Sequence, residues 1–227
     1  MTTALVSGGK DSVYSAYLAD SQGLTVDELV TIAPEDPDSF LFHTPNVGLV
    51  ALIAQASGKR HRLVPVQGSG EAVETEALRG VLSGRDDAVI AGAIASAYQW
   101  SRLERLTFEL GRPLYVPLWG KSAGTVVREE ISAGLDIRLV QVAAEPLGPE
   151  LVGRRLDLPL LEELEHRSAH VRPIQVAGEG GEYETLVVDA PFFASRLELT
   201  TEGVEQRGIA ARWNVRNARL VPKPEPS

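Results

Sequence analysis

A glycine-rich segment near the start of the chain carries residue types that bind phosphate. It reads Ser7-Gly8-Gly9-Lys10-Asp11-Ser12, after a short apolar run and before an amphipathic stretch. Two adjacent glycines let consecutive backbone N–H groups converge on an anion, and a helix that begins there adds its own N-terminal donors. Lys10 contributes positive charge and the serines contribute hydroxyl groups. We therefore predict a phosphate site over residues 7–12, against the alternative of a tight turn that needs glycine only for its geometry.

The acidic residue within this segment indicates a metal ion. The carboxylate of Asp11 would repel a phosphate unless a cation lay between them, so we predict Mg²⁺ with Asp11 as a ligand. A second sequence, Gly120-Lys121-Ser122, is similar to the end of a Walker P-loop. That motif needs a further glycine at position 115, where this chain has tyrosine, so we interpret Gly120-Lys121-Ser122 as a plain turn.

An acidic, glycine-rich octapeptide lies in the second half of the chain. Gly178-Glu179-Gly180-Gly181-Glu182-Tyr183-Glu184-Thr185 crowds three carboxylates into one loop before an apolar strand. Like charges this close together are unfavourable unless a cation binds among them. The candidate cations are Mg²⁺, ammonium, a trimethylammonium group of a substrate, and an arginine such as Arg102. A solvated acidic turn is the alternative interpretation.

These segments need a scaffold, and the first half of the chain predicts a parallel α/β sheet. Short apolar runs alternate with amphipathic stretches of helical period. We expect strands at 3–6, 29–33, 62–66, 88–91 and 114–116, and helices at 12–19, 47–56, 71–82 and 94–110. Such alternation is typical of a sheet with helices on both faces, which binds ligands beyond the carboxyl ends of its strands. The loops after Val6, Ala33 and Ala91 should therefore line the site.

The pattern changes after about residue 122, which predicts a second, smaller α+β lobe. We expect helices at 126–133 and 160–168 and strands at 136–142, 185–189, 197–201 and 209–218. The predicted organisation is thus a first domain over 1–122, a second over 123–218, and a disordered tail over 219–227 that is rich in proline.

Composition narrows the functions that this chain can have. The formal net charge is -9, which disfavours a nucleic-acid partner because the phosphate backbone needs a basic face. The absence of cysteine excludes thiolate nucleophiles and cysteine-held metal clusters. No apolar run of roughly 18 residues is present and the N-terminus lacks the pattern of a secretory signal, so we expect no membrane partner and a cytoplasmic location.

The two motifs together resemble a known enzyme family. Residues 7–12 resemble the PP-loop, S-G-G-x-D-S, of the N-type ATP pyrophosphatase superfamily. The octapeptide, continued by Val188-Asp189-Ala190-Pro191-Phe192-Phe193, is similar to the diphthine–ammonia ligase family. Smaller pieces of the family pattern agree, at 39–46, 92–94, 96, 98–99, 102–104 and 117–119. One position departs from it, because Ala97 stands where the family usually has aspartate.

This resemblance implies a fold, a reaction and partners. The fold would be a doubly wound parallel sheet of the adenine nucleotide alpha hydrolase-like (HUP) type. The enzyme would use ATP and Mg²⁺ to adenylate a carboxylate, release pyrophosphate, and let ammonia from free ammonium displace AMP. The carboxylate would belong to a modified histidine, diphthine, on elongation factor 2 or on a bacterial counterpart. The oligomeric state, a homodimer included, stays open.

The resemblance also implies roles for single residues. Catalytic roles are expected for Lys10, Asp11, Glu182 and Glu184, and ATP binding for Ser7, Gly8, Gly9, Lys10, Asp11 and Ser12. Substrate binding is expected for His43, Ser96, Tyr98, Gln99, Arg102, Glu104, Glu179, Gly180, Gly181, Glu182, Tyr183, Glu184 and Thr185. His43 has an alternative role as a helix cap or a core residue.

Two other functions fit the same fold. The chain could be an ATP or AMP sensor that does not turn over, or a nucleotide hydrolase or transferase that acts on another substrate such as an RNA base. The intact segment at 7–12 and the acidic octapeptide favour ligation over sensing. The net charge and the missing cysteines disfavour chemistry on RNA.

Overall fold

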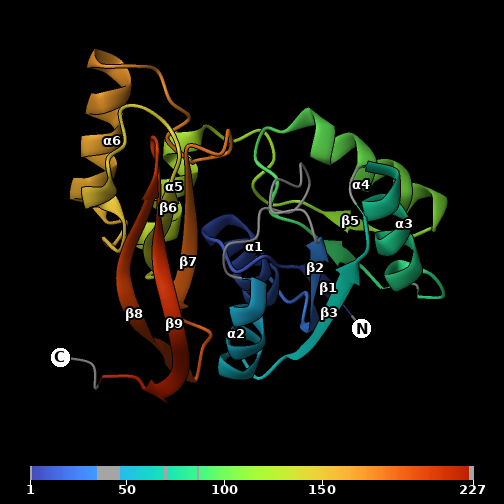
Figure 1. Ribbon diagram of the computed structural model, residues 1–227. Helices are drawn as coiled ribbons and strands as arrows, with labels where there is room; N and C mark the ends of the chain where they lie inside the picture. The colour runs from blue at the N-terminus through green and yellow to red at the C-terminus, as the bar shows by residue number, and fades with distance from the viewer. Residues whose placement is uncertain (1, 35–46, 69–70, 86, 225–227) are drawn as a thin grey trace. The chain divides into compact units, whose positions relative to one another are not determined.

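A computed structural model describes residues 2–34, 47–68, 71–85 and 87–224. The chain splits into two compact units (Figure 1). The first comprises Met1–Gln55 and Lys59–Gly120, and the second comprises Ala56–Gly58 and Lys121–Ser227. Among the described residues, no helix is long and apolar enough to cross a membrane.

The first unit is built on a parallel sheet whose strand order is β3-β2-β1-β4-β5. Its strands are β1 (Thr2–Leu5), β2 (Val26–Pro34), β3 (Arg60–Val66), β4 (Val89–Ile90) and β5 (Leu114–Tyr115). The chain starts in the middle of the sheet, winds outward to β3, and then returns to add β4 and β5 on the other side. This order is that of a doubly wound sheet, which confirms the predicted α/β fold class.

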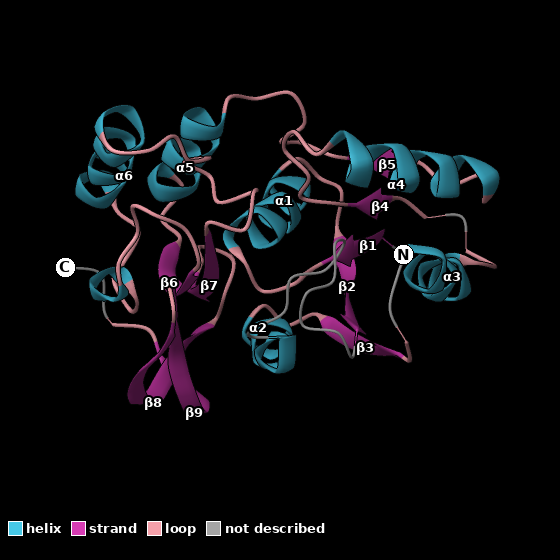
Figure 2. Ribbon diagram, turned by 45° about the horizontal axis from the view of Figure 1, so that its top comes forward, coloured by secondary structure: helices cyan, strands magenta, loops and turns pink. Residues whose placement is uncertain are grey.

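Helices cover both faces of this sheet. Helices α1 (Lys10–Ser21) and α2 (Val50–Ala56), the latter after the 3₁₀ turn η1 (Val47–Leu49), lie on one side, and α3 (Glu71–Leu82) and α4 (Ala97–Glu109) lie on the other (Figure 2). The core under α3 and α4 joins Ile32 and Val66 of the sheet to Leu82 and Leu106 of the helices. Each of these side chains is at most 3% exposed, and burial of one such side chain is worth about 1.5–3 kcal/mol.

Two helices begin at other residues than expected at the edge where the site was predicted, and α1 begins at Lys10 and not at Ser12. Helix α4 begins at Ala97 and not at Ile94. The backbone carbonyl of Ser96 accepts the first helical hydrogen bond, from the N–H of Trp100 at 3.0 Å. Ile94 instead lies in the turn after β4, where its side chain is buried and its carbonyl accepts from the N–H of Gly120. Ile94 is therefore apolar because it is buried in a turn, and not because it belongs to the helix.

The second unit holds an antiparallel sheet of order β7-β6-β9-β8. Its strands are β6 (Asp136–Val142), β7 (Tyr183–Asp189), β8 (Ser195–Arg207) and β9 (Ala210–Pro222), and the long β8–β9 hairpin is red in Figure 1. Helices α5 (Ala123–Ser132) and α6 (Leu158–His170) pack against each other, and a 3₁₀ turn, η2 (Pro149–Leu151), precedes α6. Helix α6 buries Leu160, Leu161 and Leu164.

The predicted tail over 219–227 was wrong for its first residues. Strand β9 continues to Pro222, which pairs with Ser195 of β8, and Leu220 pairs with Leu197. Beyond the strand, the ammonium of Lys223 donates to the carbonyl of Ala190 at 2.7 Å. Proline dominates the composition only after position 221, so it does not prevent pairing of the residues before it. Residues 225–227 lie outside the described part of the chain.

The second glycine–lysine–serine sequence is a turn, as predicted. Ser122 is the N-cap of α5, and its hydroxyl accepts from the N–H of Thr125. The ammonium of Lys121 lies 2.6 Å from the carboxylate of Glu129. A serine that caps a helix and a lysine that pairs along it need no phosphate to explain them.

Candidate functional site

The glycine-rich segment leaves the central strand of the parallel sheet at its carboxyl end. Strand β1 lies between β2 and β4, so the segment sits where the strand order reverses, the usual place for a ligand in an open α/β sheet. Gly8 has φ 91°, a left-handed conformation that L side chains rarely adopt. Gly9 is the N-cap of α1 and no side chain caps that helix end. The N-cap residues of α5 and α6 each accept a hydrogen bond with their side chains, whereas the N-cap residue of α1 is a glycine that has no side-chain acceptor.

Ser12 holds the segment in shape. Its hydroxyl donates to the carbonyl of Gly9 at 3.0 Å and accepts from the N–H of Ser7 at 3.2 Å. The hydroxyl of Ser7 lies 3.3 Å from that of Ser12. These contacts join the two ends of the segment across the glycines, so its backbone is organised before a ligand arrives.

Lys10 and Asp11 form an ion pair at the start of α1. The Lys10 ammonium lies 2.6 Å from the Asp11 carboxylate, and the lysine side chain is 1% exposed while the aspartate is 27% exposed. A buried ammonium at a helix N-terminus adds to the positive potential there. The start of α1 therefore carries a buried positive charge, on Lys10, next to a partly accessible carboxylate, on Asp11. Among the described residues, no group of three or more His, Cys, Asp or Glu side chains forms a metal site.

The turn after β4 packs directly on the start of α1. A Cβ built on Gly92 would lie 2.7 Å from the carbonyl carbon of Asp11 and 2.8 Å from the backbone nitrogen of Ser12. Only glycine allows this approach, because real Cβ atoms do not come within 3.0 Å of backbone atoms. The sequence predicts that the loop after Ala91 lines the site, but it assigns Gly92 itself no role there. A lone glycine directly after a buried strand was the available signal.

Four of the residues predicted to bind substrate lie in the first turns of α4, namely Tyr98, Gln99, Arg102 and Glu104. Tyr98 is 43% exposed, and the guanidinium carbon of Arg102 lies 3.6 Å from the centre of its ring. Burial raises the pKa of Tyr98, and the charge of Glu74 on α3 adds to that shift. Burial lowers the pKa of Arg102. A cation already covers one face of this aromatic ring, which is a cation–π arrangement.

The remaining predicted residues of the first unit lie in different settings. Glu104 is on the exposed side of α4, and Gln99 is in the helix's first turn. Next to Gln99, the ring of Trp100, which was not predicted as a site residue, stacks on Trp119 with centroids 4.7 Å apart. His43, with residues 39–46, lies outside the described part of the chain.

The octapeptide belongs to the second unit, where it forms a tight turn leading into β7. The carboxylate of Glu182 accepts from the N–H of Gln175 and from the N–H of Gly180, each at 2.9 Å. Gly178 has φ 76°, and a Cβ there would lie 2.8 Å from the carbonyl oxygen of Tyr183. The buried Tyr183 donates its hydroxyl to the carbonyl of Val176 at 2.6 Å. The glycines therefore serve the turn, and one of the three carboxylates binds the loop's own backbone.

The other octapeptide residues border this turn. Glu179 is half-buried within it, and Gly181 has φ 80°. Glu184 and Thr185 are in β7, where they pair with Gln141 and Leu139 of β6, and both are half-buried. The structure thus groups the predicted residues into two sets, with 7–12 and the start of α4 in the first unit and 178–185 in the second.

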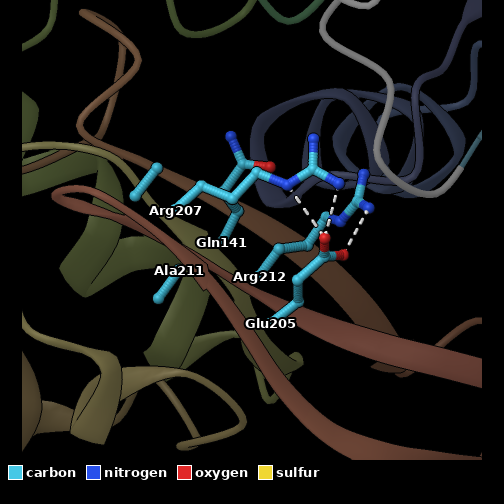
Figure 3. A pocket seen from close by; sticks show the side chains of 6 residues that line it. Gln141, Glu205, Arg207, Ala211 and Arg212 are labelled. Carbon is cyan, nitrogen blue, oxygen red and sulfur yellow. Dashed lines mark hydrogen bonds and ion pairs between the residues drawn. The ribbon is translucent and has the colours of Figure 1, made fainter.

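An open pocket in the second unit contains none of these residues. It is lined by Gln141, Glu205, Arg207, Ala210, Ala211 and Arg212, at the end of the β8–β9 hairpin (Figure 3). The Glu205 carboxylate contacts the guanidinium groups of Arg207, at 2.7 Å, and Arg212, at 3.1 Å. Hydrogen bonds from these two arginines lower the pKa of Glu205. The two arginines thus pair with a carboxylate of the same hairpin.

Comparison with known proteins identifies the family. The model of the diphthamide synthase N-terminal domain matches residues 1–113, and that of the C-terminal domain matches residues 123–221. A diphthine–ammonia ligase from Danio rerio is 31% identical over 85% of this chain and 84% of its own length. The Homo sapiens diphthine–ammonia ligase is 30% identical over 86% of this chain and 80% of its own length.

Two further matches differ in the share of the matched protein that this chain covers. The diphthine–ammonia ligase from Schizosaccharomyces pombe is longer, and the match spans 36% of it. A solved structure described as a predicted subunit of a tRNA methyltransferase from Methanocaldococcus jannaschii aligns with a TM-score of 0.47 at 16% identity, over 84% of this chain and 98% of that one. Because both domain models match, and relatives about as long as this chain match over most of their length, the chain belongs to the diphthine–ammonia ligase family.

Proposed function

We propose that this chain is an ATP-dependent ligase that joins ammonia to the carboxylate of a diphthine side chain and releases AMP and pyrophosphate. The names of its relatives support the diphthine and ammonia substrates. The observation that carries the proposal is the start of α1, where a helix whose N-cap is Gly9 begins with the buried side chain of Lys10. Such an arrangement suits the outer phosphates of ATP.

The first chemical step activates the carboxylate. Hydroxide or oxide is a poor leaving group, so the free carboxylate resists attack by ammonia. A carboxylate oxygen attacks the α-phosphorus of ATP, the bond from that phosphorus to the bridging oxygen breaks, and pyrophosphate leaves with the electron pair. The N–H groups at the start of α1 and the Lys10 ammonium stabilise the charge that builds on pyrophosphate.

The second step forms the amide. The lone pair of ammonia attacks the carbonyl carbon of the acyl adenylate, the bond from that carbon to the AMP oxygen breaks, and the nitrogen loses a proton. The products are the amide, AMP and a proton. The chain contributes mainly by holding the reactants in place, which accounts for large rate effects in such reactions.

Mg²⁺ fits this proposal as an ion that arrives with ATP. Proteins usually bind Mg²⁺ through one or two carboxylates together with substrate phosphates, so no dedicated cluster of acidic side chains is needed. Asp11 is partly exposed at the phosphate segment and would supply one oxygen. The ion would neutralise part of the phosphate charge. The carboxylate would then share its charge between the ion and Lys10.

Arg102 and the octapeptide are proposed to recognise the substrate. The planar guanidinium of Arg102 is suited to the diphthine carboxylate, because it can donate two parallel hydrogen bonds. Its place over the ring of Tyr98 keeps it oriented. Glu179 and Glu184 of the octapeptide remain candidates for the trimethylammonium or ammonium cation, since the carboxylate of Glu182 is already bound to backbone N–H groups.

The nucleotide product tests the reaction type. The chain would be incubated with ATP, Mg²⁺ and ammonium, with and without diphthine-bearing elongation factor 2. AMP and pyrophosphate that depend on the protein substrate would support ligation, and ADP would contradict it. Tight ATP binding without turnover would favour the sensor. Lys10→Ala and Asp11→Ala should each abolish pyrophosphate release in folded protein, and activity retained in both would remove residues 7–12 from the site.

The cytoplasmic location and the possible homodimer remain predictions. The proposed reaction requires neither of them. Fractionation of the host cell tests the first, and sedimentation of the purified chain tests the second.

A further inference from the structure

Val6 lies between the end of β1 and the phosphate segment, and a side chain of β2 is hydrogen-bonded to its backbone. The N–H of Val6 donates to the carbonyl of Val30 at 2.9 Å, as in a parallel ladder. The carbonyl of Val6 accepts a hydrogen bond from a side chain, the hydroxyl of Thr31 on β2, at 2.8 Å. Val6 is 3% exposed and Thr31 is 1% exposed, so water does not replace this bond. Ser7 follows directly.

A third strand orients the hydroxyl. His61 of β3 places its Nε2 atom 3.0 Å from the Thr31 hydroxyl oxygen. A hydroxyl has a single hydrogen, and Thr31 donates it to Val6, so the histidine must be the donor in this contact. Burial lowers the pKa of His61, which favours the neutral ring, and the donor role at Thr31 requires the proton on Nε2. The bonds thus run in one direction, from His61 through Thr31 to Val6.

The hydroxyl needs an explanation beyond packing. Valine has the same shape as threonine and suits a buried strand equally well, whereas a buried hydroxyl costs free energy unless it is hydrogen-bonded. Here the hydroxyl donates one hydrogen bond to Val6, the residue from which the phosphate segment departs, and accepts its other hydrogen bond from His61. The direction of the Val6 carbonyl fixes the peptide plane that enters Ser7, and hence the direction in which the N–H groups beyond it point.

We propose that Thr31 is a positioning residue for the nucleotide: it fixes the Val6 peptide and thereby aims the N–H groups of residues 8–10 at the phosphates, with His61 holding its hydroxyl. This inference rests on the proposed use of ATP at that segment. Thr31 does not touch the nucleotide itself. Its effect should appear in ATP binding and in the order of the segment.

The test compares three threonine variants. Thr31→Val removes the hydroxyl and keeps the shape, and Thr31→Ser keeps the hydroxyl. Thr107→Val is the matched control, because Thr107 is 2% exposed and its hydroxyl bonds only carbonyls of its own helix among the contacts described, Leu103 at 2.7 Å and Glu104 at 3.1 Å. The readouts are KM for ATP and kcat in pyrophosphate release, and backbone hydrogen exchange of residues 7–12.

The expected result is a selective effect on ATP. Thr31→Val should raise KM for ATP about tenfold with a smaller change in kcat, as for loss of one buried hydrogen bond. It should also speed exchange at residues 7–12. Thr31→Ser should restore both values to within about twofold of the wild type. His61→Ala should have an intermediate effect, and Thr107→Val should change neither readout.

Several outcomes would overturn the inference. An unchanged KM for ATP together with unchanged exchange in Thr31→Val would do so, as would an equal effect of Thr107→Val. The inference would also be contradicted if Thr31→Ser did not restore the KM for ATP and the slow hydrogen exchange of residues 7–12. If the wild-type chain released no pyrophosphate, the proposed function would fail, while hydrogen exchange would still decide whether Thr31 orders the segment.

Discussion

Gly92 and Asp11 touch through their backbones: a Cβ on Gly92 would lie 2.7 Å from the carbonyl carbon of Asp11. The contact joins the turn after β4 to the start of α1, the two segments on either side of the switch point of the sheet. The start of α1 is thus braced from the neighbouring strand. The position of the N–H groups that we propose to bind phosphate therefore depends on Gly92, a residue without a side chain.

Replacing Gly92 by alanine should disable the site while leaving most of the fold intact. The added methyl group must push the backbone of Asp11 and Ser12 away, because backbone atoms cannot yield as a flexible side chain can. A displacement of about 1 Å at a positioned group costs about a hundredfold in rate, so we expect a loss of that size in kcat/KM for ATP. The measurement is pyrophosphate release at varied ATP.

Gly80→Ala is the matched control for this change. Gly80 lies within α3, and a Cβ there meets nothing within 4 Å. Alanine in a helix is more stable than glycine by roughly 0.5–1 kcal/mol, so this variant should gain stability and keep its activity. Equal activity of the Gly92 and Gly80 variants would show that the brace has no role.

Removing the carboxylate of Glu182 should loosen the octapeptide turn. In Glu182→Ala the N–H groups of Gln175 and Gly180 lose their acceptor, whereas Glu182→Gln retains one oxygen. We expect hydrogen exchange at these two amides to rise in the order wild type, Glu182→Gln, Glu182→Ala, and amide formation to fall in the same order. Slow exchange and full activity in Glu182→Ala would mean that the carboxylate neither shapes the turn nor takes part in the reaction.

Glu28 should make the first unit sensitive to acid. Burial raises the pKa of this carboxyl, but the hydrogen bond from Arg85 and the charges of Arg62, Arg85 and Arg60 outweigh it and hold the pKa below 4.5. A lowered folded-state pKa gives stability that is present above pH 4.5 and is lost as the pH falls through the folded value. Urea unfolding between neutral and acidic pH should show Glu28→Gln less stable than wild type near pH 7. A gap between the two proteins that stays constant on acidification would contradict this.

Arg112 should matter for stability and not for nucleotide binding. Its side chain is 0% exposed, its guanidinium lies 3.2 Å from the Asp87 carboxylate, and its Nε donates to the Asp87 carbonyl at 2.7 Å. Breaking a buried pair leaves an uncompensated charge, so Arg112→Met should lower the free energy of unfolding by about 3–5 kcal/mol. Arg105→Met, at a side chain 82% exposed, should leave the urea midpoint unchanged. A stable Arg112→Met would show that Asp87 does not need this partner.

The sequence predicted the first unit well because its signals are local. Alternating apolar runs and helical periods define β1 to β5 and the helices between them, and the glycines at 8 and 9 mark the phosphate segment. The long hairpin was underestimated because Gly203, at φ 90°, sits within a register shift between Thr201 and Val204. This irregularity breaks the alternation of apolar and polar residues, so the sequence predicts a strand that ends at residue 201, whereas β8 continues to Arg207.

The sequence indicates which residue types form the candidate site, but it does not indicate which of these residues contact one another. Nothing in the local pattern shows that Gly92 meets Asp11, because the two are far apart in the chain. The bond from Gly180 to Glu182 was also hidden, since three carboxylates in one loop read as a site for an external cation. The contact between Gly92 and Asp11 depends on how the sheet assembles, which periodicity alone does not specify.

The most direct test of the account follows the oxygen atoms of the substrate carboxylate. Diphthine on elongation factor 2 would be labelled with oxygen-18 in its carboxylate and converted with ATP, Mg²⁺ and ammonium, and the nucleotide product would be examined by mass spectrometry. Adenylation of the carboxylate predicts AMP that carries one labelled oxygen for each amide formed. Unlabelled AMP, or formation of ADP, would contradict the central claim.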